Sequence, residues 1–249
     1  MASSVQLLAH CGGSVPRYEL KVENNKLYIN LLSCTERLKA KYNMANPAMS
    51  LMREPVRQEG RLRILGLSKT PMDKQYPRYS TSENVLNNAL KKAEGDLNIE
   101  SRILFLSEMN SPHCKGFCFK SEKACSWPSS ITKMDSQDEM IHIYEGLVHW
   151  ADVVVVATTI RWGSASSLYY KMAERLNSVQ NQITLKNKVL IKNKVASFII
   201  TGGQDNIQAL AGQMVSFFSE QNFKLVALKK YIKSFLWVFI VPNIKISSK

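Results

Sequence analysis

The sequence predicts an α/β domain built on an open, parallel five-stranded sheet with helices on both faces. From Arg61 onward, apolar strand patterns alternate with amphipathic helical patterns, which is typical of parallel sheets. The unbroken apolar run Val153–Val156 indicates a strand that is buried on both sides. Polar segments follow three of the predicted strands, at the edge where such sheets bind ligands.

The first three predicted elements are a strand, a helix and a second strand. Residues 62–67 are mostly aliphatic, which favours a strand, and residues 102–106 have the same character. Residues 82–93 between them form an amphipathic helical pattern. The apolar face of that helix is predicted to consist of Val85, Leu86, Ala89 and Leu90.

The middle of the chain predicts a helix at 135–149, a strand at 153–157 and a helix at 166–179. The first of these helices has one apolar side, which indicates that it packs on the sheet. Its apolar side consists of Met140, Ile143, Tyr144 and Leu147. The strand at 153–157 is the most strongly predicted element of the chain, because four valines favour a buried strand.

The last predicted elements are a strand at 195–200, a helix at 207–219 and a fifth strand at 223–228. Asp205 and Asn206 precede the helix, and both residue types are good N-caps. Strands that alternate with helices in this way imply right-handed crossovers in one sheet.

Residues 1–60 do not continue this pattern and are predicted to be an N-terminal extension, to which the sequence assigns no role. Residues 18–22 and 26–31 flank Glu23–Asn25 and predict a hairpin. The stretch 43–55, rich in Met, Asn and Pro, predicts a linker. The main domain is therefore expected to span 61–249.

Composition indicates a soluble protein with a net charge of +13. Most of the basic excess lies in residues 183–249, which favours a solvated lysine-rich face. We do not expect nucleic-acid binding, because no motif of aromatic and basic residues accompanies this charge. No signal peptide is evident, and the apolar run Phe235–Val241 is too short to span a bilayer, so we expect a cytoplasmic protein without membrane contact.

Three strand-end segments carry the residues that point to a binding site. The first, Ser68–Ser82, ends in hydroxyl residues at a helix start, where phosphate binds well, although a simple N-cap would look the same. The second, Thr158–Ser164, contains Trp162, whose ring could stack on a flat ligand or belong to the core. The third, Thr201–Asn206, has paired glycines, which suit either close ligand approach or an ordinary turn.

Residues 61–223 resemble the NAD(P)H-dependent FMN reductases, a flavodoxin-like family that includes the iron–sulfur flavoproteins. The resemblance rests on these stretches: Ile64–Ser68, Ser80–Ser82, Ala151–Gly163, Tyr170–Leu176 and Thr201–Asn206. It implies the flavodoxin-like strand order 2-1-3-4-5. It also implies FMN as cofactor and NAD(P)H as co-substrate.

The resemblance implies a role for each strand-end segment. The residues expected to hold the FMN phosphate are Ser68, Ser80, Thr81 and Ser82. Those expected to line the isoalloxazine ring are Thr158, Thr159, Ile160, Arg161, Trp162 and Gly163. Those expected to approach the ring from the fourth strand are Gly202, Gly203, Asp205 and Asn206. No side chain is assigned as catalytic acid or base, because flavin carries the redox chemistry.

Two departures from the family pattern affect these expectations. Thr159 stands where relatives commonly have proline. Because proline would rigidify the segment, its absence lowers the preorganisation of the segment. After Phe223 the familiar pattern stops, so the C-terminal end of the domain is expected to be atypical.

The resemblance implies an FMN-dependent oxidoreductase that passes hydride from NAD(P)H through flavin to a small-molecule acceptor, such as a flavin or quinone. It also implies a homo-oligomer. The alternative is a non-catalytic, flavin-binding electron-transfer protein. Steady NADPH consumption with an added acceptor would separate the two.

Three cysteines, Cys114, Cys118 and Cys125, form a cluster after the second predicted strand. Iron–sulfur flavoproteins place a cysteine motif in this region, but a four-iron cluster normally needs four thiolates. With His113 the cluster could instead bind zinc as a Cys3His site. Unligated thiols on a loop are the third interpretation.

Overall fold

The structure is a computed structural model in which residues 20–23, 26–29, 46–57, 59–71, 76, 78–117, 124–202, 206–225 and 236–238 are described. Two predicted site residues, Gly203 and Asp205, lie outside the described residues, as does Cys118.

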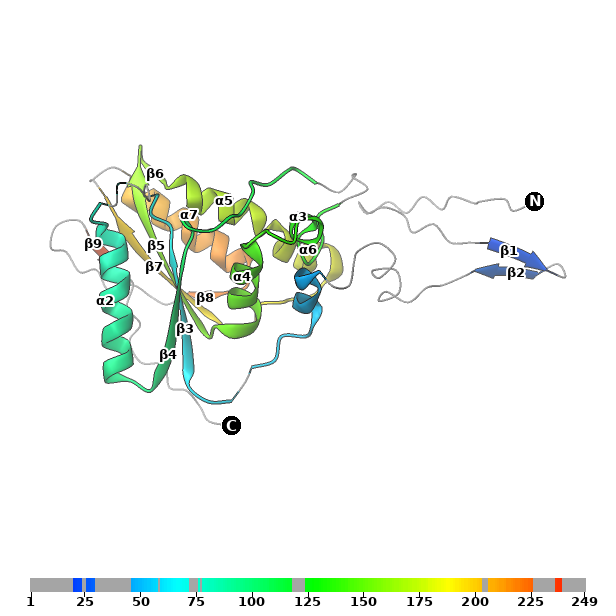
Figure 1. The fold of residues 1–249 in the computed structure, drawn as a ribbon, viewed down its shortest axis with the longest axis horizontal. Helices are drawn as coiled ribbons and strands as arrows, with labels where there is room; N and C mark the ends of the chain where they lie inside the picture. The colour runs from blue at the N-terminus through cyan, green and yellow to red at the C-terminus, as the bar shows by residue number, and fades with distance from the viewer. Residues whose placement is uncertain are drawn as a thin grey trace.

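A parallel sheet forms the centre of the fold (Figure 1). Its parallel strands are β3 (Leu62–Ser68), β4 (Ile99–Phe105), β5 (Val153–Arg161), β7 (Val195–Thr201) and β8 (Lys224–Leu225). They lie in the order β4-β3-β5-β7-β8, and each neighbouring pair is parallel. This arrangement confirms the predicted α/β class and the strand order 2-1-3-4-5.

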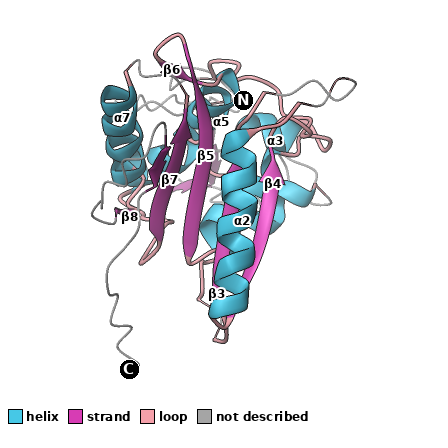
Figure 2. Cartoon of the chain, turned by 90° about the vertical axis from the view of Figure 1, so that its left-hand side faces the viewer, coloured by secondary structure: helices cyan, strands magenta, loops and turns pink. Residues whose placement is uncertain are grey.

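Helices cover both faces of this sheet (Figure 2). On one face lies α2 (Thr81–Asp96), whose Leu86 and Leu90 pack with Ala157 and Ile199. The other face is covered by α4 (Met140–Tyr144), α5 (Ser167–Arg175), α6 (Asn177–Lys186) and α7 (Ile207–Glu220).

Strand β5 packs apolar side chains on both of these faces. Val154 and Val156 are fully buried in the larger core cluster, whereas Val155 packs against the α2 cluster. Side chains of a strand alternate between the faces of its sheet, so a strand covered on both faces needs an unbroken apolar run. The prediction of a doubly buried strand from the four valines is therefore confirmed.

The helix predicted at 135–149 begins later than expected. Helix α3 (Ser130–Met134) ends before Asp135, α4 starts at Met140, and a π-helical turn, η2 (Glu145–Trp150), continues it. The carboxylates of Asp135 and Asp138 accept hydrogen bonds from the backbone N–H groups of Gln137 and Met140, at 2.9 and 3.2 Å. Such local bonds compete with helix formation.

Two antiparallel additions extend the parallel sheet. β6 (Ser164–Ala165) pairs with the end of β5, and β9 (Leu236–Val238) pairs with the end of β7. β8 pairs only with the start of β7. β8 and β9 therefore lie beside successive stretches of β7. The atypical C-terminal end thus contributes a strand to the sheet.

The N-terminal region contains a hairpin of β1 (Leu20–Glu23) and β2 (Lys26–Ile29) and a 3-10 helix, η1 (Pro47–Met52). The prediction that 43–55 is a linker is wrong for η1, because Leu51 is fully buried in the main core. Its carbonyl oxygen also accepts a hydrogen bond from Trp127 Nε1 at 3.0 Å. Residues before the predicted boundary at 61 therefore pack into the main domain.

Candidate functional site

A cleft of about 410 Å³ lies at the carboxyl edge of the parallel sheet. It is lined by the connection from β3 to α2, by the end of β5 and by the end of β7. Its lining residues are Thr70, Pro71, Arg78, Tyr79, Ser80, Thr81, Thr159, Ile160, Arg161, Thr201 and Gly202. The structure thus brings together the three segments that the sequence singled out, because parallel strands end at a common edge.

A cluster of hydroxyl groups forms the first wall of the cleft, at the N-terminus of α2. Ser80 is the N-cap, and its Oγ accepts a hydrogen bond from the backbone N–H of Glu83 at 3.3 Å. The same hydroxyl donates to Thr70 Oγ1 at 3.2 Å, and Thr70 Oγ1 lies 2.7 Å from Ser82 Oγ. Free N–H groups and the positive dipole end of a 16-residue helix add to these donors.

Ser68 and Ser82 lie deeper than expected for direct ligand contact. Ser82 is fully buried and Ser68 is only 2% exposed, and neither lines the cleft. Ser68 is the last residue of β3, and its carbonyl oxygen accepts a hydrogen bond from the Leu106 N–H at 3.0 Å. These two serines support the wall, whereas Ser80 and Thr81 line it.

The second segment is a hairpin rather than the expected loop. Strand β5 continues through Arg161, and Ile160 and Arg161 pair with Ala165 and Ser164 of β6. The two residues of the turn, Trp162 and Gly163, have φ values of 50° and 69°. Positive φ at both central residues is what a type I′ turn requires, and such turns suit the twist of two-stranded ribbons.

Residues of this hairpin are placed very differently from one another. Thr159, Ile160 and Arg161 line the cleft. Thr158 is fully buried, and its Oγ1 lies 3.5 Å from Ser166 Oγ. Trp162 is fully exposed at the turn, so it neither lines the cleft nor belongs to the core.

The third segment reaches the cleft through Thr201 and Gly202. A Cβ atom on Gly202 would lie only 2.8 Å from Ile160 Cβ, so the absence of a side chain allows the close approach of the two segments. Asn206 is the N-cap residue of α7, although its side chain makes no capping hydrogen bond. Its Nδ2 instead donates a hydrogen bond to the Gly163 carbonyl oxygen at 2.6 Å.

The polarity of the cleft favours an anionic ligand with hydrogen-bonding groups. Arg78 and Arg161 are the charged residues of the described lining, and no acidic residue lines it. Thr159 Oγ1 is buried and has no hydrogen-bond partner among the described residues. An unpaired buried hydroxyl is costly, so a ligand that hydrogen-bonds to Thr159 would satisfy it.

Lys69 lies buried directly behind the site. Its Nζ donates to Met172 Sδ and lies 5.3 Å from the centre of the Tyr169 ring. Its carbonyl oxygen accepts a hydrogen bond from Ser166 Oγ. Burial lowers the pKa of the Lys69 ammonium well below its usual range. A lysine without an ionised partner in an apolar site is not predictable from the local sequence.

Sequence reasoning missed Thr70, Pro71, Arg78, Tyr79 and Thr201 as lining residues. Four of them lie inside the segment 68–82, which the sequence singled out only for its terminal hydroxyls. Thr201 is the last residue of β7. Position at a strand end is therefore the signal that would have found it.

The cysteine cluster is only partly described. Cys114 is exposed and Cys125 is half-buried, and both are free thiols. The Cys125 N–H donates a hydrogen bond to the Phe117 carbonyl oxygen at 2.7 Å. Across the described ranges, no three His, Cys, Asp or Glu side chains come together as metal ligands. Since Cys118 lies outside these ranges, metal binding by the cluster stays a prediction.

The fold is an open α/β sheet with a cleft at its carboxyl edge, which is where proteins of this class bind ligands. Residues 63–234 match the sequence model of the NADPH-dependent FMN reductases. The chain belongs to this family of flavin-dependent oxidoreductases. The comparison with curated proteins gave no match.

The chain is also similar to solved structures, and the likeness to the first of these supports the fold. A structure of RosB with bound 8-demethyl-8-formylriboflavin-5'-phosphate is 19% identical, with a TM-score of 0.52, over 66% of this chain and 62% of that chain. The apo form of an NADH:FMN oxidoreductase, EMOB, is 17% identical, with a TM-score of 0.47, over 67% and 73% of the two chains. An azoreductase from Bacillus anthracis str. Sterne is 13% identical, with a TM-score of 0.45, over 66% and 85%. The chain thus spans less than two thirds of RosB.

No helix among the described residues has the length and apolar character that crossing a membrane requires.

Proposed function

We propose that the protein is an FMN-dependent oxidoreductase that takes hydride from NAD(P)H and reduces a small-molecule acceptor. The observation that carries this proposal is the convergence of three strand ends on one cleft, with a hydroxyl cluster and a helix N-terminus at one side. Membership of the NADPH-dependent FMN reductase family supports the same function.

We assign the FMN phosphate to the N-terminus of α2. Ser80 and Thr81 line the cleft there, and Thr70 and Ser82 hold the hydroxyl cluster in place. Arg78, two residues before the N-cap, adds a positive charge at the same wall. Helix N-termini bind phosphate through free N–H groups, so a phosphate would satisfy both the helix end and the hydroxyls.

We assign the isoalloxazine ring to the space between the ends of β5 and β7. Thr159 and Ile160 form one wall, and Thr201 and Gly202 form the other. The unpaired Thr159 hydroxyl fits a ring that carries hydrogen-bonding nitrogen and oxygen atoms. The adjacent Gly203 and Asp205 complete this wall in the proposal.

When bound, the flavin would supply the hydride and electron chemistry. In the proposal, the chain's own residues bind and orient the reactants. The exposed mouth beside Arg161 leaves room for a nicotinamide or an acceptor to approach.

The test is reduction of the FMN-loaded protein by NADPH without oxygen, followed by steady-state turnover with a quinone. The proposal predicts loss of the flavin absorbance and then NADPH consumption in proportion to the acceptor. If the flavin binds but is reduced by neither NADPH nor NADH, the protein would instead be a non-catalytic electron carrier. Light scattering after size-exclusion chromatography tests the proposed homo-oligomer separately.

A further inference from the structure

Arg161 is a charged residue at the mouth of the cleft that has no side-chain partner among the described residues. It is the last residue of β5, lines the cleft and is exposed to solvent. Within the described part of the chain, it makes no hydrogen bond through its side chain and no ion pair. The guanidinium is therefore available to a ligand.

Arg161 lies well beyond the level at which the neighbouring strand β3 ends. Ala157 is in register with Ser68, the last residue of β3, and the Lys69 N–H donates to the Ala157 carbonyl oxygen at 2.9 Å. Arg161 lies four residues further along β5, which places its Cα about 13 Å beyond this level of the sheet. The cleft therefore extends from the hydroxyl cluster at the start of α2, beside Arg78, to the exposed Arg161 at the end of β5.

The hairpin holds the Arg161 backbone in place. Arg161 pairs with Ser164, and the turn between them is fixed to α7 by the hydrogen bond from Asn206 to Gly163. An arginine on a paired strand loses less freedom on binding than one on a loose loop. Arg161 is thus suited to selecting a ligand and not only to attracting one.

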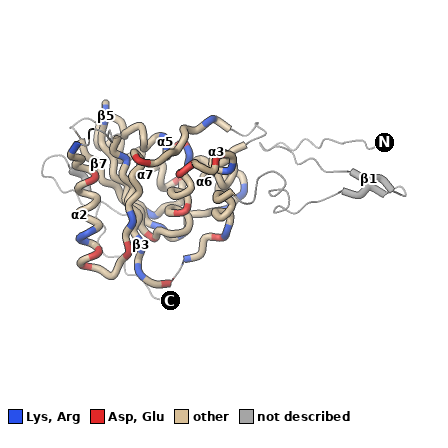
Figure 3. The backbone as a smooth tube through the Cα atoms, in the orientation of Figure 1, with Lys and Arg blue, Asp and Glu red and all other residues tan. Residues whose placement is uncertain are grey.

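Among the described residues, the cleft lining contains arginines and no acidic residue. Elsewhere in the described chain, acidic and basic residues are interspersed (Figure 3). Glu83 lies in the first turn of α2 and does not line the cleft. Guanidinium groups bind phosphate, sulfonate and carboxylate groups through paired hydrogen bonds.

We propose that Arg161 is a specificity-determining residue that selects a second substrate carrying an anionic group. This inference rests on the proposed function, in which the phosphate of FMN occupies the hydroxyl end and leaves Arg161 to the substrate that follows. The anionic group has two sources: the 2′-phosphate of NADPH, or an acid group on the electron acceptor.

The experiment compares Arg161→Gln with Lys91→Gln in the FMN-loaded protein. Lys91 is an exposed residue of α2, ten positions beyond the start of the helix and about 15 Å along it, so its substitution removes the same charge away from the cleft. Calorimetry measures binding of 2′,5′-ADP against 5′-AMP for the first source. It measures anthraquinone-2-sulfonate against 2-(hydroxymethyl)anthraquinone for the second.

Arg161→Gln is expected to weaken the more charged member of at least one pair roughly tenfold and to leave the other member unchanged. When the corresponding nicotinamides or quinones are used as substrates, kcat/KM should fall for the more charged member and stay unchanged for the other. Lys91→Gln should leave both ratios unchanged, and Arg161→Lys should restore part of the discrimination.

The two pairs identify the source. A loss confined to 2′,5′-ADP assigns Arg161 to the nicotinamide phosphate, and a loss confined to the sulfonate assigns it to the acceptor. Equal ratios in Arg161→Gln and wild type for both pairs would overturn this inference alone. Failure of the wild-type protein to bind FMN would overturn the proposed function instead.

Discussion

Asn206 at the start of α7 donates a hydrogen bond from Nδ2 to the Gly163 carbonyl oxygen, at 2.6 Å. This bond joins the connection after β7 to the turn of the β5–β6 hairpin, two segments far apart in the sequence. Both segments reach the candidate site, so the bond fixes one wall of the cleft relative to the other.

Replacing Asn206 with glycine is expected to loosen this wall. Asn206 has a φ of 59°, which glycine adopts without strain, so the substitution removes the side-chain bond and keeps the backbone. Losing one such bond should weaken FMN binding roughly three- to tenfold, measured by fluorescence titration.

Asn222→Gly is the matched control. Asn222 also has a positive φ, and its Nδ2 donates to the Ile191 carbonyl oxygen at 2.6 Å. Since Asn222 and Ile191 belong to none of the three segments that line the cleft, this variant should change stability by a similar amount and leave FMN affinity unaltered. Equal FMN affinities in the two variants would contradict a role for Asn206 in shaping the site.

A methyl group at Gly202 is expected to disturb the cleft. It would lie 2.8 Å from Ile160 Cβ and 3.2 Å from the Ile160 backbone nitrogen, so the end of β5 must shift. Gly202→Ala should destabilise the fold by about 1–3 kcal/mol and weaken FMN binding. Gly212→Ala is the control, because a Cβ there meets no atom within 4 Å and should stabilise α7 by about 0.5–1 kcal/mol. Unchanged FMN affinity in Gly202→Ala would refute the assignment of this wall.

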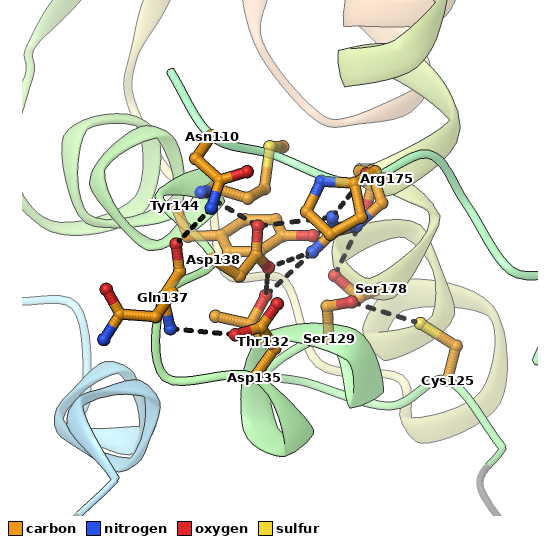
Figure 4. A network of polar contacts seen from close by, with 12 residues as sticks. Asn110, Cys125, Ser129, Thr132, Asp135, Gln137, Asp138, Tyr144, Arg175 and Ser178 are labelled. Carbon is orange, nitrogen blue, oxygen red and sulfur yellow. Dashed lines mark hydrogen bonds and ion pairs between the residues drawn. The ribbon is translucent and has the colours of Figure 1, made fainter.

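Breaking the buried ion pair between Arg175 and Asp138 should be strongly destabilising (Figure 4). Thr132 Oγ1 donates to Asp138 Oδ2 at 2.6 Å and accepts from Arg175 Nη2 at 2.9 Å, within the same network. Arg175→Met leaves the Asp138 carboxylate buried without its cation, so we expect a loss of about 3–5 kcal/mol in urea unfolding.

The exposed pair Lys92–Asp96, with a separation of 2.9 Å, provides the comparison. Lys92→Met should cost less than about 1 kcal/mol, because solvent screens the pair. Similar losses of unfolding free energy in Arg175→Met and Lys92→Met would contradict the expected cost of leaving Asp138 buried without its cation.

Because Lys194 is buried, we expect the free energy of unfolding to rise with pH. Burial lowers its pKa to about 8, opposed by Asp152 and assisted by Arg63, while Glu145 opposes it more weakly. Between pH 8 and the unfolded value of 10.5 the unfolded chain binds more protons, so the free energy of unfolding increases with pH in that window. Lys194→Met should lack this rise, which is on the order of 3 kcal/mol, when the free energy of urea unfolding is measured across the pH range. A difference from wild type that stays constant between pH 7 and pH 11 would contradict the lowered pKa.

The strands were predictable because their signal is local. Val153–Val156 places apolar side chains on both faces of the sheet. These four residues predict a buried strand without information from any other part of the chain. The carboxyl ends of the strands then follow from parallel topology, which explains why the three segments of the cleft could be named in advance.

The features that could not be predicted depend on distant residues. Arg175 is buried because Asp138 lies beside it in the fold, and the local sequence does not indicate this partner. The turn at Trp162 and Gly163 lacks the usual Asn-Gly signal, so a loop was expected where the structure has a hairpin. The helix at 135–149 was placed too early because side-chain bonds of Asp135 and Asp138 were not anticipated.

The most direct test of the proposed site is to compare the affinities of the purified protein for FMN and for riboflavin, which lacks the phosphate. If the hydroxyl cluster and the N-terminus of α2 hold the phosphate, FMN should bind roughly 10- to 100-fold more tightly than riboflavin. The difference should shrink in Ser80→Ala, which removes a lining hydroxyl. Equal affinities for the two flavins, or no binding of either, would contradict the account.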